Sequence, residues 1–188
     1  MSFVYLLNLG ANYTLVFLVP TLIKGWGVAD VFMVGLLSSI PAVAGVIGMV
    51  LVGRSSDKHL ERRKHFFFCQ ALAAAGLLVS VFSGGNLVVA LAGLAIMSIG
   101  QSSNSPIFFA AISEYLPRKS AAGGIALISC LGNLGPSVLP LLITWITTTS
   151  GSSTNSMYLV CAMWIVSALI LMRAIRSAPS VRAQLAVA

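Results

Sequence analysis

The fold is decided by residues 66–113, which read FFFCQALAAAGLLVSVFSGGNLVVALAGLAIMSIGQSSNSPIFFAAIS. This stretch of 48 residues contains no Asp, Glu, Lys or Arg. Since an α-helix needs about 20 apolar residues to cross the hydrocarbon core of a bilayer, the stretch is long enough for two crossings. The sequence Ser83-Gly84-Gly85-Asn86 near its middle is typical of a turn. Residues 66–113 therefore predict two membrane-spanning helices joined by a tight turn.

Three further stretches without charged residues flank this one, at 1–23, 31–53 and 120–172. The first two are each long enough for one span. The third holds 53 residues with a polar run at 147–156, which predicts two spans. The fold class is therefore an all-α polytopic membrane protein with six transmembrane helices. The expected spans are 2–23, 31–53, 66–82, 87–115, 121–146 and 157–172, in a membrane domain over 1–173 that is followed by a cytoplasmic tail over 174–188.

The composition excludes a soluble globular protein. Of the 188 residues, 58% are hydrophobic and only 8% are charged, whereas soluble domains carry about 25% charged residues. The net charge of +7 would suggest nucleic-acid binding in a soluble chain. Here the basic residues lie in short clusters between apolar runs, so membrane topology explains them and no nucleic-acid partner is expected.

The positive charges also predict an orientation. Ten of the eleven Lys and Arg residues follow span 2, span 4 or span 6, whereas Lys24 lies between spans 1 and 2. Alternate crossings place those three segments on one side of the membrane, and basic residues favour the cytoplasmic side. Both termini are therefore expected in the cytoplasm.

Polar side chains gather in three of the six expected spans. A polar group in hydrocarbon is costly, so it normally faces other helices or a water-filled cavity. We therefore expect spans 1, 4 and 5 to line a polar interior and spans 3 and 6 to face lipid. The alternative is that these side chains only form hydrogen bonds between helices. The candidates are Tyr5, Asn8 and Asn12 in span 1, Gln101, Ser103 and Asn104 in span 4, and Ser129 and Asn133 in span 5.

Span 4 contains Pro106, and span 5 contains Pro136 and Pro140. A proline can simply kink a buried helix. Broken helices are also the places where membrane transporters open backbone groups to a substrate. The sequence leaves both interpretations open.

No residue pattern for covalent chemistry is visible. Both histidines, His59 and His65, lie in the basic loop between spans 2 and 3, so no Ser, His and acid set can converge within the membrane. The three cysteines are scattered singly and lack metal-ligand spacing. We therefore expect no enzyme, no metal site and no cofactor. All four carboxylates lie near span ends, so none is expected at mid-membrane to carry a proton.

The loop after span 2 carries a recognisable motif. It reads GRSSDKHLERR over residues 53–63 and resembles the G-x-x-x-D-[RK]-x-G-x-[RK]-[RK] signature of the major facilitator superfamily. The resemblance implies a conformational latch, in which a glycine permits close helix approach and an aspartate pairs with basic groups. The matching residues, called the latch motif below, are Gly53, Asp57, Lys58, Arg62 and Arg63.

Three segments are similar to the anion:cation symporter branch of this superfamily, at residues 17–22, 53–63 and 121–135. The resemblance implies two six-helix halves, each built from two three-helix repeats, with this chain as the carboxyl-terminal half in a cell membrane, the bacterial inner membrane. It also implies alternating access and transport of a small organic anion, coupled to a proton or another cation. Substrate contacts would come from the eight polar candidates above, with Asn133 the first choice. The expected partners are the lipid bilayer and an amino-terminal six-helix half.

Two alternatives of other kinds remain. The chain could be a truncated membrane protein that does not transport but pairs with or modulates another carrier, since no charge lies near the middle of its expected spans. A self-paired half-transporter is less favoured because two copies would supply no charge inside the cavity for an anion.

Overall fold

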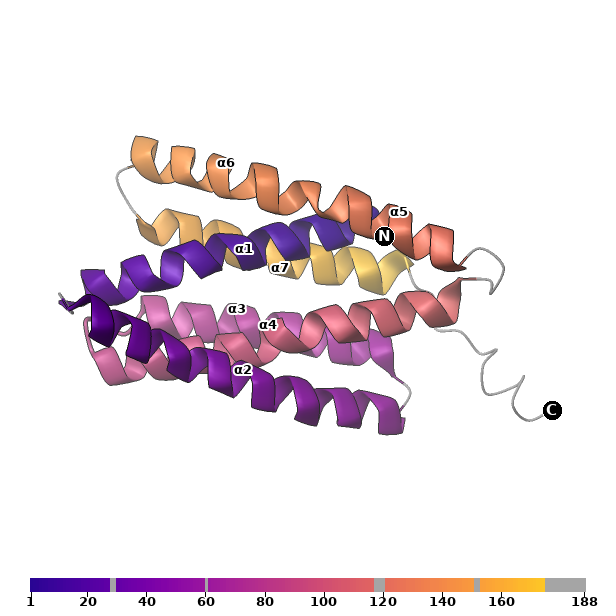
Figure 1. Ribbon diagram of the computed structural model, residues 1–188, viewed down its shortest axis with the longest axis horizontal. Helices are drawn as coiled ribbons and strands as arrows, with labels where there is room; N and C mark the ends of the chain where they lie inside the picture. Colours follow the sequence, from indigo (N-terminus) through magenta and orange to yellow (C-terminus); the bar gives the residue numbers. More distant parts are fainter. Residues whose placement is uncertain (28–29, 60, 117–120, 151–152, 175–188) are drawn as a thin grey trace.

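The computed structural model describes residues 1–27, 30–59, 61–116, 121–150 and 153–174 (Figure 1). Its helices form six candidate membrane spans, as expected, because α5 and α6 follow one another along a single span. The fold class predicted from the sequence is thereby confirmed. The helices are α1 (Ser2–Gly25), α2 (Val31–His59), α3 (Arg62–Val81), α4 (Leu87–Tyr115), α5 (Ala121–Gly132), α6 (Leu134–Ser150) and α7 (Ser153–Ala174).

Several helices extend beyond the stretches expected from charge alone. α2 continues to His59 and α3 begins at Arg62, because long charged side chains at a span end can reach the interfacial region while the backbone stays helical. α6 runs to Ser150 and α7 starts at Ser153, so most of the polar run at 147–156 is helical rather than loop. The expected boundary at 117–120 and the tail at 175–188 lie outside the described residues.

Local signals explain where the helices begin. The Asp30 carboxylate accepts a hydrogen bond from the Phe32 backbone N–H at 3.2 Å, before the start of α2. Asn86 caps α4 in the same way, accepting from Val88 N–H at 3.1 Å. The preceding turn places two glycines in the left-handed region, Gly84 at φ +59° and Gly85 at φ +90°. The turn predicted at residues 83–86 is therefore confirmed.

The break between α5 and α6 falls at Asn133, three residues before Pro136. Proline has no N–H, so the carbonyl of Gly132 loses its helical donor, and the ring also clashes with that carbonyl. Pro140 has the same effect on the carbonyl of Pro136 one turn later. The fifth span is therefore interrupted at Asn133, whereas α4 continues through Pro106. A role of the break in opening backbone groups to a substrate stays a prediction.

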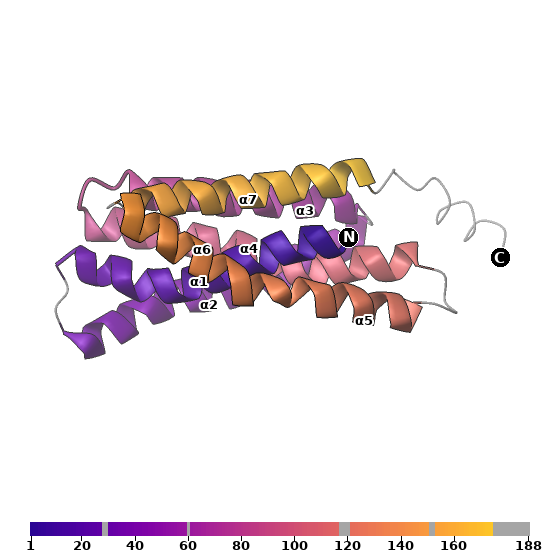
Figure 2. The ribbon, with the colours of Figure 1, turned by 90° about the horizontal axis from the view of Figure 1, so that it is seen from above.

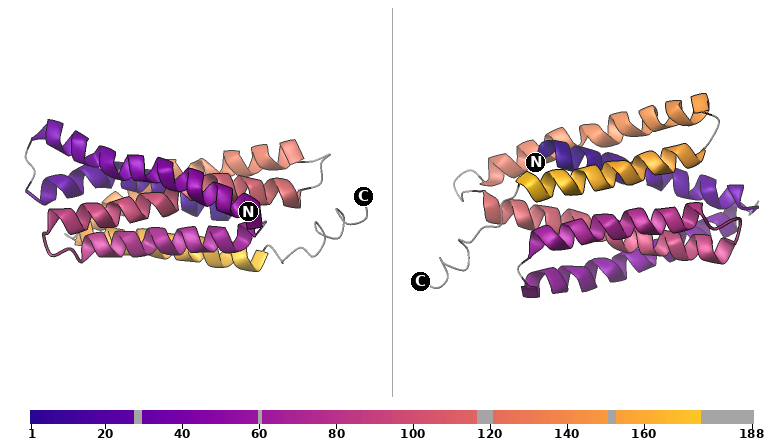
Figure 3. Two further views of the ribbon diagram at one scale, coloured as in Figure 1. Left: turned by 90° about the horizontal axis from the view of Figure 1, so that it is seen from below. Right: turned by 180° about the vertical axis from the view of Figure 1, so that it is seen from behind.

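The helices pack in a pattern with internal symmetry, and Figures 2 and 3 show their arrangement from above, from below and from behind. α1 packs on α5 and α6 as α4 packs on α2, and α7 packs on α1 as α3 packs on α4. α3 and α7 also contact one another. Exchanging the first three spans for the last three leaves these contacts unchanged. This pattern agrees with two three-helix repeats related by a pseudo-twofold axis.

Small residues allow α3 and α4 to pack closely. A Cβ atom added to Gly93 would lie 2.6 Å from the backbone nitrogen of Ser80. Glycines at Gly76 and Gly100 face backbone atoms of the opposite helix in the same way. Small residues at helix interfaces let the backbones approach in the absence of a hydrophobic driving force within lipid.

That spans 3 and 6 face lipid stays a prediction, and their helices also bury much of their surface within this chain. Their helices, α3 and α7, have the largest buried shares of the six spans at 44% each, whereas the α5–α6 span has 17%. They also hold a fully buried polar pair, in which Gln70 Nε2 donates to Ser167 Oγ at 2.9 Å. Each helix does keep an exposed apolar side, for example at Phe68 on α3 and Leu169 on α7. The number of polar residues in a span thus did not indicate how many neighbours its helix has.

Basic residues are segregated to one end of the bundle. The ends of α2, α4 and α7 lie there together with the starts of α1, α3 and α5 (Figure 1). The described basic residues of this end are Arg54, Lys58, Arg62, Arg63, Lys64 and Arg173, and Lys24 lies at the opposite end, in the last turn of α1. We call the end that carries these six residues the basic end. Its placement in the cytoplasm stays a prediction.

Candidate functional site

The polar candidates of α1 lie inside the bundle. Asn8 and Asn12 are 3% and 7% exposed, and Asn12 Nδ2 donates to Asn8 Oδ1 at 3.1 Å. The indole Nε1 of Trp164 on α7 donates to Asn12 Oδ1 at 3.3 Å. This hydrogen bond joins α1 to α7, which is the alternative role that the sequence left open for these amides. A substrate contact by either amide stays a prediction.

Tyr5 is part of an aromatic group between α1 and α4. Its ring stacks on Phe108 with centroids 5.2 Å apart and meets the edge of Phe109 at 5.0 Å. Gly132, at the end of α5, makes room for this ring, because a Cβ there would collide with it. Tyr5 therefore packs three helices together at the basic end of the α5–α6 span.

The candidates of α4 are divided between two environments. Ser103 is fully buried, and its hydroxyl donates to the Ile99 carbonyl at 2.8 Å. Asn104 is also fully buried, and neither atom of its amide has a hydrogen-bond partner among the described residues. Gln101 is half-buried. An unpartnered amide in the interior is costly, so Asn104 is the α4 candidate with capacity left to bind a polar group.

The candidates of the fifth span lie at its break. Ser129 is half-buried and Asn133 is exposed. The Asn133 amide donates to the Ser129 carbonyl at 2.8 Å and keeps its own carbonyl oxygen exposed. The structure therefore does not bring all eight candidates into one site. Tyr5, Asn8 and Asn12 lie in the interior, whereas Asn133 lies on a surface.

A groove of about 200 Å³ between α1 and α6 was not predicted from the sequence. Two threonines from each helix line it: Thr14 and Thr21 on α1, and Thr144 and Thr147 on α6. Each hydroxyl donates to the carbonyl four residues before it, for example Thr144 to Pro140 at 2.8 Å. Thr147 Oγ1 also accepts a hydrogen bond from Ser156 Oγ, whereas the other three hydroxyl oxygens keep their acceptor capacity. The spacing of the threonines, seven residues on α1 and three on α6, would have indicated one face of each helix.

Arg62 is the centre of the latch motif in this structure. It forms ion pairs with Asp57 and with Glu114 at the end of α4, the second at 3.2 Å, and it also donates to Ser56 Oγ at 3.2 Å. Arg62 thus connects the ends of α2 and α4 to the start of α3. The expected pairing of Asp57 with a basic group is present.

The expected role of Gly53 is not supported. A Cβ atom added there would meet nothing within 4 Å among the described residues, so no helix of this chain approaches it closely. Lys58 is exposed and Arg63 is half-buried, and Arg62 is the basic residue of the motif that forms ion pairs. A spacing motif cannot show which of its basic residues lies within reach of a carboxylate, because that depends on the angle between the helices.

Metal binding finds no support in the described part of the chain, where no group of three or more His, Cys, Asp and Glu residues lies close enough to hold an ion. His59 and His65 do lie near one another, with ring centroids 6.1 Å apart. The Nδ1 atom of each ring lies 2.9 Å from a backbone carbonyl and donates to it.

Comparison with known proteins decides the family. The family model described as Major Facilitator Superfamily matches residues 1–186. The chain belongs to the Major Facilitator Superfamily. As a superfamily member it is a multi-pass membrane protein of a transporter family and not an enzyme.

Relatives in the superfamily cover most of this chain. A protein of Agrobacterium vitis named "Putative tartrate transporter" is 35% identical over 179 residues, which are 95% of this chain and 39% of that protein. The Quinolone resistance transporter of Acinetobacter baumannii is 35% identical over 139 residues, which are 74% of this chain and 32% of that protein. The Inner membrane transport protein RhmT of Escherichia coli (strain K12) is 27% identical over 172 residues, 91% of this chain and 40% of that protein. The chain thus spans a third to two fifths of the length of these relatives.

Proposed function

We propose that this chain is the carboxyl-terminal half of a secondary active transporter for small organic anions, of the anion:cation symporter branch of the superfamily. The observation that carries the proposal is the 35% identity with the A. vitis tartrate protein over 95% of this chain. Tartrate is a hydroxylated dicarboxylate, so a site for it needs hydrogen-bond donors and positive charge. An amino-terminal half, on the same chain or a separate one, would complete the transporter.

The polar groups of this half suit a supporting role in anion binding. The Asn133 amide, at a helix break, and the threonine groove between α1 and α6 offer neutral hydrogen-bonding groups on the fifth span and its neighbour. All four carboxylates of the chain, Asp30, Asp57, Glu61 and Glu114, lie at helix ends or between helices. In this proposal the amino-terminal half therefore supplies both the coupling carboxylate for a proton and the cation that faces the anion.

Uptake of labelled tartrate into proteoliposomes tests the proposal. The chain would be joined to the amino-terminal part of the A. vitis relative, and the intact relative would serve as the positive control. We expect uptake that depends on a proton gradient and is abolished by a protonophore. A chimera that inserts into the membrane and remains monodisperse but takes up no tartrate or related dicarboxylate would overturn the proposed substrate class.

Replacing Asn133 tests the site within that chimera. Asn133→Ala removes one neutral hydrogen bond, worth about 1 kcal/mol, so transport at limiting substrate should fall about fivefold. Asn155→Ala is the matched control, because Asn155 is also exposed but lies at the start of α7, outside both the break and the groove. Equal uptake by the two variants would remove Asn133 from the site.

The second candidate function is that of a membrane protein that pairs with another carrier without transporting. It is favoured by the absence of any Asp, Glu, Lys or Arg from the middle of the spans. An antibody to residues 173–188, used on membrane extracts, distinguishes the two functions. A native band near 19.7 kDa that co-purifies with an intact carrier and transports nothing would favour pairing, whereas a band at more than twice that mass would favour the transporter.

We also propose that the basic end faces the cytoplasm of a bacterial cell, across the inner membrane. The support is the segregation of the described basic residues to that end, with Lys24 at the other. A reporter enzyme that is active only in the periplasm, fused after residue 26 and separately after residue 174, would test this. If only the fusion after residue 174 were active, the basic end would lie in the periplasm and the proposed orientation would be wrong.

A further inference from the structure

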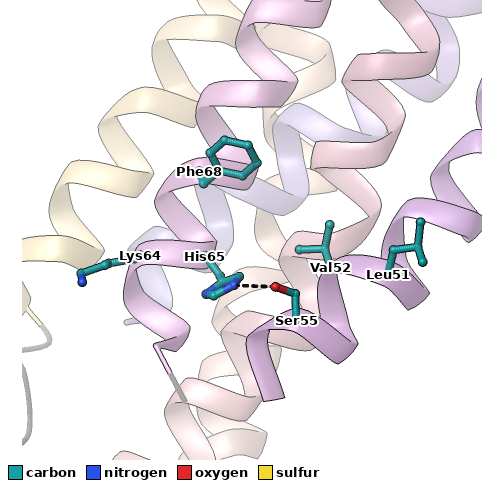
Figure 4. A pocket seen from close by; sticks show the side chains of 6 residues that line it. All are labelled: Leu51, Val52, Ser55, Lys64, His65 and Phe68. Atoms are coloured by element: carbon teal, nitrogen blue, oxygen red, sulfur yellow. Dashed lines mark hydrogen bonds between the residues drawn. The ribbon is translucent and has the colours of Figure 1, made fainter. Parts of the chain in front are cut away.

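A groove of about 350 Å³ lies between α2 and α3 at the basic end (Figure 4). α2 and α3 each pack closely on α4 but have few contacts with each other, which leaves this space between them. Its walls are apolar and come from Leu51, Val52 and Phe68, and Phe68 is 60% exposed. The site proposed for substrate uses other helices, so this groove has no role in the function proposed above.

The end of the groove nearest the loop is polar. Ser55, Lys64 and His65 line it, and Figure 4 shows the His65 ring directed at the Ser55 hydroxyl, 3.3 Å away. His65 Nδ1 lies 2.9 Å from the Glu61 carbonyl and therefore donates to it. In the neutral ring, Nε2 then accepts from Ser55. Protonation of the ring would turn Nε2 into a donor and free the Ser55 hydroxyl for another acceptor.

Positive charge dominates around this polar end. Residues 54–65 contain five Lys and Arg residues and two carboxylates, which gives a formal charge of +3 before either histidine is protonated. Lys64 is 73% exposed, and its ammonium group donates to Glu61 at 2.9 Å. An ammonium group has three donors, so Lys64 retains capacity for an anion. The other carboxylate of residues 54–65, Asp57, pairs with Arg62, which also pairs with Glu114.

We propose that the groove binds one phospholipid with an anionic headgroup. An acyl chain would lie against Leu51, Val52 and Phe68, and the phosphate would meet Ser55 and His65. The Lys64 ammonium group pairs with Glu61 and points away from these two residues in Figure 4, so its exposed side chain would turn toward the phosphate on binding. The apolar walls and the basic rim occur at the end of two membrane spans, where the acyl chains and headgroups of one leaflet meet. A small soluble anion would use the rim but not the walls, and a neutral lipid would use the walls but not the excess charge. Basic pockets between transmembrane helices recognise anionic headgroups by this combination.

Native mass spectrometry of the 188-residue chain in detergent tests the proposal. The probes are dioleoyl phosphatidylglycerol and dioleoyl phosphatidylcholine, which share acyl chains and differ in headgroup charge. We expect one phosphatidylglycerol molecule to be retained with higher affinity than phosphatidylcholine. Since each basic residue near the headgroups contributes about a fivefold change in affinity, Lys64→Gln should weaken the phosphatidylglycerol adduct about fivefold.

Matched variants distinguish binding in this groove from non-specific attraction of anionic lipid to the basic end. Arg173→Gln removes one exposed positive charge from the same end of the bundle, on α7, and should leave the adduct unchanged. Phe68→Ala should weaken the binding of both lipids. Phe82→Ala removes an exposed ring just beyond the opposite end of α3 and should leave the binding of both lipids unchanged. Circular dichroism would confirm that each variant keeps its helical content.

Three results would overturn the proposal. Equal retention of the two lipids would exclude recognition of headgroup charge. Equal losses of phosphatidylglycerol affinity in Lys64→Gln and Arg173→Gln would show that the lipid is attracted by the overall charge of the basic end and not by a specific site. Displacement of phosphatidylglycerol by millimolar inorganic phosphate, together with no effect of Phe68→Ala, would show that the rim binds a free anion instead of a lipid.

Discussion

The close approach of α3 and α4 makes Gly76→Ala the most informative stability variant. A Cβ atom at Gly76 would lie 2.7 Å from the Gly93 carbonyl oxygen and 2.9 Å from the Met97 Cα atom. Both are backbone atoms, so no change of rotamer can relieve the collision. The two helices would have to separate by about half an ångström, which disturbs packing along the whole interface.

The expected cost follows from overpacking. Forcing one additional methyl group into a well-packed interior costs about 1–3 kcal/mol. Alanine is also a better helix former than glycine by about 1 kcal/mol, which offsets part of that cost. Gly35→Ala in α2 shows the gain in helix propensity alone, because a Cβ at Gly35 would meet nothing within 4 Å. The free energies of unfolding of the two variants should therefore differ by about 1–3 kcal/mol, with Gly76→Ala the less stable.

Thermal unfolding in detergent with a thiol-reactive dye measures this difference. Cys69 and Cys161 are buried and become reactive on unfolding, whereas Cys130 is exposed and would be replaced by serine in every sample. A change of 1 kcal/mol shifts the melting temperature of a chain of this size by about 2–4 °C. Gly76→Ala should therefore melt about 2–12 °C below Gly35→Ala. Equal melting temperatures would refute the inference that these backbones are in direct contact.

Three further predictions use thermal unfolding, and the last follows it by circular dichroism because a thiol-reactive dye needs the thiolate, which is absent in acid. Arg62→Gln should lower stability by about 1 kcal/mol, because it removes two partly exposed ion pairs, whereas Lys58→Gln should have no effect; similar shifts in both would contradict the role assigned to Arg62. A double-mutant cycle between Trp164→Phe and Asn12→Ala should give a coupling energy of about 0.6–1.7 kcal/mol, and additive effects would mean that their hydrogen bond contributes nothing. A hydrogen bond from Lys64 lowers the pKa of the Glu61 carboxyl below its ordinary value. The pair therefore stabilises the protein fully at pH values above the ordinary pKa of a glutamate, and this contribution is lost as the pH falls through the lowered pKa. The difference in melting temperature between the wild type and Glu61→Gln should therefore be present at pH 7 and disappear in acid, and a difference independent of pH would exclude the ion pair as its cause.

The number and kind of the helices could be predicted because they depend on the solvent. Within hydrocarbon every backbone N–H and carbonyl must be paired inside the chain, so a long stretch without charge can only be a helix or part of a barrel. Residues 66–113 therefore sufficed for two spans and their turn. The helix ends were less predictable, since α2 and α3 continue into charged sequence that also suits a loop.

The candidate site was predicted only in part, because a residue list contains no helix rotation. The spacing of Asn8 and Asn12 correctly placed them on one face of α1, but the packing of α1 against α7 directs that face at Trp164. The threonine groove needs two helices at once, so neither helix alone indicated it. In the same way, the latch motif located a basic segment, and the crossing of three helix ends selected Arg62 as its ion-paired member.

The sequence by itself determined that the chain enters the membrane, how often it crosses, and that its positive charge gathers between particular spans. These properties follow from the transfer of each segment between water and lipid, which depends on local composition. The tertiary structure alone decided which polar groups are buried between helices, where α3 and α4 meet, and which grooves stay open. These depend on contacts between residues far apart in the chain, such as Gln70 with Ser167, whose geometry is set by the packing of all the helices together.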